Sequence, residues 1–147
     1  MNSASSLDIW TFQQTITRRL MAWSLFSILA GAGMFWGDAL WRGIGVQFVA
    51  WGLIDLAIAV FGAIGTQRRW SQWTPEERLA AQPRERTQLA RILWLNAGLD
   101  VLYVAGGLTL WLTLGSTDLF WRGGGWGIIV QGGFLFFFDV YHALKLR

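Results

Sequence analysis

Four long apolar runs dominate this 147-residue sequence and restrict its fold more than any other feature. They lie near residues 20–36, 44–64, 92–114 and 127–144. A helix crosses a bilayer with about 20 apolar residues, and each run approaches or exceeds that length. Only 14% of the residues are charged, against roughly a quarter in soluble domains. We therefore expect a single all-α integral membrane domain over residues 1–147, built as a four-transmembrane-helix bundle.

The positive charges are distributed unevenly among the segments that connect these runs. Ten of the twelve Lys and Arg residues lie before the first run, in the loop at 67–91 or after the last run. If all four runs span, these segments share one side of the membrane, and only Arg42 and Arg122 lie on the other. The positive-inside rule then predicts a multi-pass protein of the cytoplasmic membrane, with both termini in the cytoplasm.

The loop at 67–91 carries the signals of a short helix. Thr74 suits the cap, Pro75 the first position, and Glu76 and Glu77 the first turn. The arginines of this loop alternate with glutamates, and no base-reading motif is present, so we expect no nucleic-acid partner. The lipid bilayer is the partner that the composition predicts.

Two stretches of the sequence resemble each other. "WRGIGVQFVAWGLID" and "WRGGGWGIIVQGGFLFFFD" each contain Trp-Arg-Gly, then Gln, then Asp eight residues after the Gln. The second stretch has four more residues before the Gln, about one helical turn. Two parallel helical hairpins are one interpretation, and chance similarity between Gly- and Trp-rich helices is the other.

Polar residues lie within the last three runs at spacings that place them on one helix face. Asn96, Asp100 and Tyr103 stand at i, i+4 and i+7. Because lipid cannot satisfy a carboxylate or an amide, we expect the polar faces to point at one another. The candidate ligand-binding residues are Trp51, Asp55, Asn96, Asp100, Tyr103, Gln131, Asp139 and His142.

Three intramembrane aspartates need compensation, because no Lys or Arg lies inside a run. An ionised aspartate at mid-bilayer costs at least about 2.5–3.5 kcal/mol. The carboxyl groups can be protonated, bind a cation, or accept hydrogen bonds from the neighbouring polar residues, with His142 available to Asp139. Interhelical hydrogen bonding, at about 0.6 kcal/mol for each contact, is the structural alternative to a site.

These features leave three functional hypotheses open. The first is binding or transport of a small cation, a proton or a cationic small molecule at Asp55 and Asp100, by a protein that we expect to be a homodimer. The second is a structural or assembly subunit held together by its polar stripe. The third and weakest is an intramembrane enzyme, since no nucleophile is evident. With one His and no Cys, we expect no metal centre and no cofactor.

Two motifs carry a family resemblance. "NAGLDVLY" and "QGGFLFFFD" resemble the patterns Asn-x-Gly-Leu-Asp-x-x-Tyr and Gln-Gly-x-Phe-Leu-x-x-x-Asp of an uncharacterised family of small four-helix bacterial membrane proteins. The resemblance covers the third and fourth runs and implies a bacterial inner membrane. It groups Asn96, Asp100, Tyr103, Gln131 and Asp139 as one unit, and it implies no chemistry.

Overall fold

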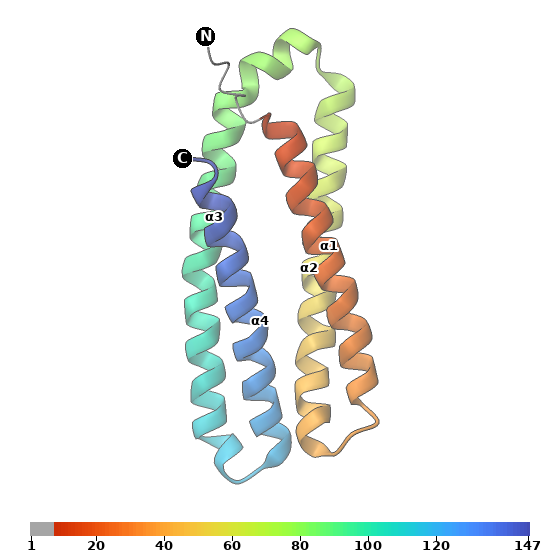
Figure 1. Cartoon of the computed structure of the whole chain (residues 1–147), viewed down its shortest axis with the longest axis vertical. Coiled ribbons are helices and arrows are strands. Elements are labelled where there is room, and N and C mark those ends of the chain that lie inside the picture. Colours follow the sequence, from red (N-terminus) through yellow and green to blue (C-terminus); the bar gives the residue numbers. More distant parts are fainter. Residues whose placement is uncertain (1–7) are drawn as a thin grey trace.

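The computed structural model of the chain describes residues 8–147 and contains four long helices (Figure 1). The helices are α1 (Ile9–Met34), α2 (Ala39–Gln72), α3 (Pro75–Leu112) and α4 (Leu119–Leu144), with a short 3-10 helix η1 (Leu114–Ser116) before α4. The predicted all-α fold with four helices is confirmed. The predicted single domain of residues 1–147 stays a prediction, and residues 1–7 lie outside the described residues.

Each helix begins at a polar side chain that caps its free amide groups. Asp8, Asp38 and Asp118 accept hydrogen bonds from backbone amides in the first turns of α1, α2 and α4. At the start of α3, Thr74 and Glu77 form a reciprocal capping box, and Pro75 follows the cap. The start predicted for a helix at Thr74 is therefore correct.

The segment 67–91 differs from the prediction of a loop that contains one short helix. It is formed almost entirely by the ends of two long helices, because α2 continues to Gln72 and α3 begins at Pro75. The first turns of α3 arch over one end of the molecule before the helix turns along it (Figure 1). Pro83 lies inside α3, where it removes one backbone hydrogen bond and favours a bend.

The helices form two antiparallel hairpins, α1 with α2 and α3 with α4, and the hairpins meet where α2 packs against α4 (Figure 1). We call the end with the connections 35–38 and 113–118 the loop end. The opposite end, with the start of α1, the connection 73–74 and the end of α4, is the terminal end. The backbones of α1 and α3 contact each other little, and those of α2 and α3 are scarcely packed together.

Glycines bring the helices into close contact at the loop end. A Cβ atom on Gly43 would overlap the carbonyl oxygen of Phe120, and one on Gly123 would overlap the carbonyl oxygen of Leu40. Because both obstacles are backbone atoms, no rotamer change could relieve them.

The same reciprocal pattern holds within each hairpin. A Cβ on Gly45 would lie 2.6 Å from the carbonyl oxygen of Gly31, and one on Gly125 would lie 2.7 Å from that of Gly107. The two Trp-Arg-Gly stretches of the predicted repeat therefore have matching surroundings. The correspondence ends at the glutamines, because Gln47 lies beside Gly127 whereas Gln131 is one helical turn farther along α4.

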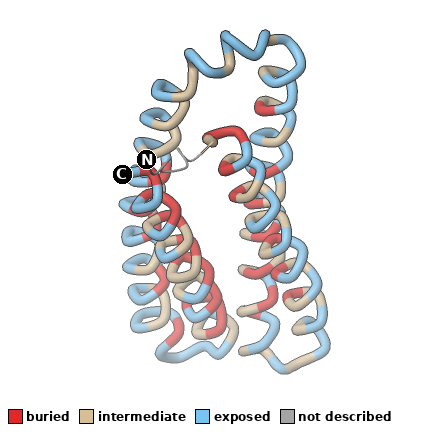
Figure 2. The backbone as a smooth tube through the Cα atoms, turned by 45° about the horizontal axis from the view of Figure 1, so that its top comes forward, coloured by how far each residue is buried: buried red, intermediate tan, exposed pale blue. Residues whose placement is uncertain are grey.

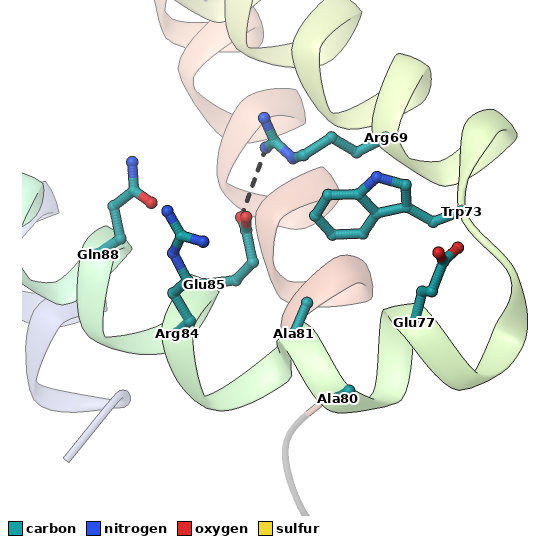
Figure 3. A pocket seen from close by; sticks show the side chains of 8 residues that line it. All are labelled: Arg69, Trp73, Glu77, Ala80, Ala81, Arg84, Glu85 and Gln88. Atoms are coloured by element: carbon teal, nitrogen blue, oxygen red, sulfur yellow. Dashed lines mark ion pairs between the residues drawn. The ribbon is translucent and has the colours of Figure 1, made fainter.

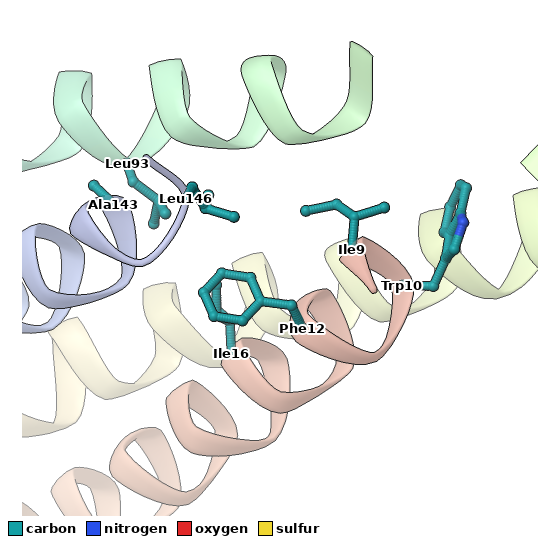
Figure 4. Close-up of a cluster of buried hydrophobic side chains, with 7 residues drawn as sticks. All are labelled: Ile9, Trp10, Phe12, Ile16, Leu93, Ala143 and Leu146. Atoms are coloured by element: carbon teal, nitrogen blue, oxygen red, sulfur yellow. The ribbon is translucent and has the colours of Figure 1, made fainter. Parts of the chain in front are cut away.

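Large apolar side chains hold the terminal end together. Ile9, Trp10, Phe12 and Ile16 of α1 pack with Leu93, Ala143 and Leu146 in the main hydrophobic cluster (Figure 4). Arg86 of α3 donates hydrogen bonds to the carbonyl oxygens of Leu146 and Arg147, which fixes the end of the chain after α4. The start of α1, which the sequence analysis placed before the first span, is thus part of the core.

The outward faces of the helices are apolar and exposed, whereas buried positions gather where the helices face one another (Figure 2). Leu29, Phe61 and Phe137 expose 73%, 73% and 72% of their surface. Within residues 8–147, three helices are long and apolar enough to span a membrane: α2, α3 and α4. The apolar part of α1 is shorter, because Arg18 and Arg19 lie in its middle. A bilayer is the solvent that such a surface requires.

Candidate functional site

A cavity of about 220 Å³ lies at the middle of the helices. Its walls combine side chains from all four helices, and six of the eight candidate residues are among them. The lining residues are Leu20 of α1; Trp51, Ile54, Asp55 and Ile58 of α2; Asn96, Leu99, Asp100 and Tyr103 of α3; and Leu135 and Asp139 of α4.

Helix periodicity explains why these side chains converge. Asn96, Asp100 and Tyr103 lie on one face of α3, and Trp51 and Asp55, four residues apart, lie on one face of α2. Asp139 reaches the cavity from α4. The three aspartates come from three different helices, so the cavity exists only when both hairpins are assembled.

The two central carboxyl groups are buried without adequate hydrogen bonding. Asp55 and Asp100 are each only 3% exposed, and the Oδ2 atom of each has no hydrogen-bond partner in residues 8–147. Asp139 is 7% exposed and lines the same cavity. A buried polar group without a partner costs about 1–3 kcal/mol, and more when charged, so this arrangement opposes stability.

Within residues 8–147, no basic side chain forms an ion pair with these carboxyl groups. In the described part of the chain, the one ion pair joins Arg69 and Glu85 near the terminal end, with 3.5 Å between Nη2 and Oε2. Over the same residues, no group of three His, Asp or Glu side chains lies close enough to hold one metal ion. The cavity therefore offers negative or proton-bearing oxygens to a ligand.

Two aromatic rings close the loop-end side of the cavity. Trp51 of α2 and Tyr103 of α3 meet edge to face, with 4.7 Å between their ring centroids. This contact joins two helices whose backbones are scarcely packed together. Aromatic rings beside carboxyl groups form a favourable environment for an organic cation, since the ring face attracts positive charge.

Gln131 lies outside the cavity and joins α1 to α4. Its Oε1 accepts a hydrogen bond of 3.0 Å from Trp23 Nε1, and its Nε2 donates one of 3.1 Å to Ser27 Oγ. Trp23 also stacks on Phe134, with ring centroids 3.6 Å apart. Gln131 is completely buried and its side-chain groups are satisfied, so it acts as interhelical glue.

His142 also lies away from the cavity, and the pairing with Asp139 that we considered is not what the structure contains. Its Nδ1 is 2.7 Å from the carbonyl oxygen of Phe138, and its Nε2 is 3.1 Å from Nη1 of Arg19. Because a carbonyl accepts and a guanidinium donates, this geometry selects the neutral ring with the proton on Nδ1. His142 therefore links α4 to α1.

A polar network that was not predicted lies nearer the terminal end. Thr66 donates a hydrogen bond of 3.1 Å to Gln13, and Gln13 donates one of 3.1 Å to Glu85, the partner of Arg69. The network borders a cavity of about 200 Å³. Its ion pair of Arg69 with Glu85 also lines a larger cavity of about 590 Å³ beneath the arch of α3 (Figure 3). The sequence contains one signal for this network. Gln13 lies three residues after Trp10 and three before Ile16, so it places a polar side chain on an otherwise apolar helix face.

The comparisons with known proteins identify a family and give no activity. The family model described as "Family of unknown function (DUF6992)" matches residues 19–140, and the chain belongs to this family. The matched range contains Asp55, Asp100 and Asp139, whereas the first turns of α1 and His142 lie outside it. No curated protein and no solved structure matches the chain.

Proposed function

We propose that this chain is a multi-pass membrane protein that binds an organic cation in the cavity bordered by Asp55 and Asp100. The observation that carries the proposal is the pair of buried Oδ2 atoms without hydrogen-bond partners at one cavity. A polar side chain that only holds helices together has its hydrogen-bonding groups satisfied, and Gln131 is an example. Two unsatisfied carboxyl groups reduce stability, so a bound partner is the simplest reason for their presence.

Each lining residue has a role in this proposal. Asp55 and Asp100 supply the charge, and Asp139 adds a third carboxyl group. Asn96 and Tyr103 offer oxygen atoms, while Trp51 and Tyr103 supply aromatic surface. Transport of the cation is an extension of the same proposal, because a site at mid-membrane is where transporters bind their substrates.

The orientation follows from charge. We propose that α1 spans together with α2, α3 and α4, and that the terminal end lies in the cytoplasm. The support is the antiparallel packing of α1 along α2, together with ten of the twelve Lys and Arg residues toward the terminal end, since only Arg42 and Arg122 lie at the loop end. The exposed Trp36, Trp41 and Trp121 at the loop end suit the opposite interface.

The test is thermal unfolding of the detergent-purified protein with tetramethylammonium, sodium, potassium or calcium chloride. A ligand at one hundred times its dissociation constant adds about 2.7 kcal/mol to the free energy of unfolding. We expect tetramethylammonium to raise the melting temperature of the natural protein and not of Asp100→Asn. Glu76→Gln, which removes an exposed carboxylate far from the cavity, is the matched control and should respond as the natural protein does.

Two results would contradict the proposal. One is that no cation changes the melting temperature at concentrations below those at which salt alone alters the detergent micelle. The other is an effect that persists undiminished in Asp100→Asn, since that would place the cation elsewhere.

A further inference from the structure

The cavity opens between two helices, on a face that we propose lies in the bilayer. All four exposed side chains around it belong to α2 or α3: Ile54, Ile58, Leu99 and Tyr103, at 48%, 55%, 41% and 40% exposure. The residues contributed by α1 and α4 are half-buried or buried. The backbones of α2 and α3 are scarcely packed together, so the opening lies between these two helices.

Side-chain contacts cross between the helices toward both ends of this opening. Toward the loop end, the Trp51–Tyr103 contact joins α2 to α3, and beyond it glycines bring α2 and α4 together. Toward the terminal end, the network of Gln13, Thr66, Glu85 and Arg69 joins α1, α2 and α3. Between these contacts, the exposed part of the cavity lining is its edge on α2 and α3.

The chemistry of the opening changes with depth. Its edge consists of Ile54, Ile58 and Leu99, which are apolar, whereas Asp55 and Asp100 lie buried behind them. A volume of about 220 Å³ is below the 300–1,000 Å³ typical of drug-sized ligand sites. The cavity can hold a compact charged head group, and any longer apolar part of the ligand must remain outside, between α2 and α3.

On the basis of the proposed function, we infer that the ligand is an amphiphilic organic cation that binds from the bilayer. Its ammonium or guanidinium head occupies the cavity beside Asp55 and Asp100, and its apolar tail passes over Ile54, Ile58 and Leu99 into the lipid. The unpaired, buried Oδ2 atoms point to the charge of the head group, and the apolar, exposed edge points to the tail.

The experiment measures saturable binding to the full chain in phosphatidylcholine nanodiscs, with binding to empty nanodiscs subtracted. The probes are tetramethylammonium and the butyl, hexyl and octyl trimethylammonium ions. If the tail of the bound probe lies in lipid, Kd in free aqueous probe falls about fourfold per methylene, which is roughly 250-fold from butyl to octyl. Asp100→Asn should abolish saturable binding of every probe.

A pair of neighbouring substitutions tests the position of the opening. Ile54→Trp enlarges a side chain at its edge, whereas Leu53→Trp enlarges an adjacent side chain of similar exposure that does not line the cavity. We expect Ile54→Trp to lower the ratio of octyl to tetramethyl affinity tenfold or more, and Leu53→Trp to leave this ratio unchanged. Equal effects of the two variants would overturn the lateral opening.

The remaining outcomes separate this inference from the proposed function. If tetramethylammonium binds and requires Asp100, but affinity is unchanged or falls as the tail lengthens, the amphiphile inference is wrong and the cation site stands. If no probe binds saturably, both fail. If affinity rises with tail length equally in Asp100→Asn, the probes partition into lipid and the inference is overturned.

Discussion

The loop end and the middle of this protein are assembled in different ways. At the loop end, backbone meets backbone: Gly43 and Gly123 lie against the carbonyl groups of Phe120 and Leu40. In the middle, helices are kept apart by side chains, and the space between them contains carboxyl groups that the protein leaves unsatisfied. One region is closely packed, while the other buries carboxyl groups at a cost in stability.

This difference explains why glycine and aspartate both occur on the inward faces of the same helices. Without a side chain, glycine lets helices approach until dispersion and weak backbone contacts act over many atoms. A buried aspartate on such an inward face takes up space between the helices, and its carboxyl group needs a hydrogen-bond or ionic partner. Three substitutions, each in one region, separate these effects, and the expected change in the free energy of unfolding decreases from the first to the third.

The largest effect is expected for Gly43→Ala. The added Cβ would overlap the carbonyl oxygen of Phe120, so α2 and α4 must separate. We expect a loss of about 3 kcal/mol or more, because overpacking against a backbone cannot be relieved by a rotamer change. Thermal unfolding in detergent measures it, and Gly33→Ala is the control, since a Cβ on Gly33 meets no atom within 4 Å. Equal melting temperatures for the two variants would show that the loop-end contact is not tight.

The next effect has the opposite sign. Asp100→Leu replaces a buried carboxyl group that has an unpaired Oδ2 with an apolar side chain, and the cavity offers space for it. We expect the free energy of unfolding to rise by about 1–2 kcal/mol, because the desolvation cost of the carboxyl group disappears. Chemical unfolding in detergent measures the gain, and cation binding should be lost at the same time. A less stable Asp100→Leu variant would mean that this carboxyl group is glue after all.

The smallest effect is expected for Gln131→Leu. This substitution removes the hydrogen bonds to Trp23 and Ser27 and leaves the Nε1 of the half-buried Trp23 without its acceptor. We expect a loss of about 1 kcal/mol, near the upper part of the range for interhelical hydrogen bonds in membranes. The same unfolding assay applies, with tetramethylammonium binding measured in parallel. Weakened binding at unchanged stability would return Gln131 to the site rather than to the contact between α1 and α4.

Much of the cavity could be predicted because helix periodicity is a local property. The i, i+4, i+7 spacing of Asn96, Asp100 and Tyr103 sets their common face regardless of what surrounds α3, and the apolar perimeter requires that face to point inward. The four-residue spacing of Trp51 and Asp55 likewise predicts one face of α2 for both, and both line the cavity.

Features that depend on a second helix could not be obtained in this way. Gln131 and His142 lie on the inward side of α4. They form hydrogen bonds with Trp23 and Arg19 of α1 and do not line the cavity. Likewise, the polar start of α3 resembles a surface loop in sequence, and only its packing beside α1 and α2 makes Glu85 part of a half-buried polar network. Periodicity predicts the direction in which a side chain points from its helix, whereas its partner on another helix depends on the relative rotation of the two helices.

The tight contact between α2 and α4 at Gly43 and Gly123 has a mechanical consequence. From Gly123 to Asp139, α4 is a rigid arm of roughly 24 Å, at 1.5 Å per residue. A swing of about 5° about the glycine contact would displace the far end of such an arm by about 2 Å, more than the radius of a carbon atom. Because Ala143 and Leu146 beyond that end pack in the main hydrophobic cluster, α4 is held at both ends, and the glycine contact and the cluster together fix the width of the carboxylate cavity.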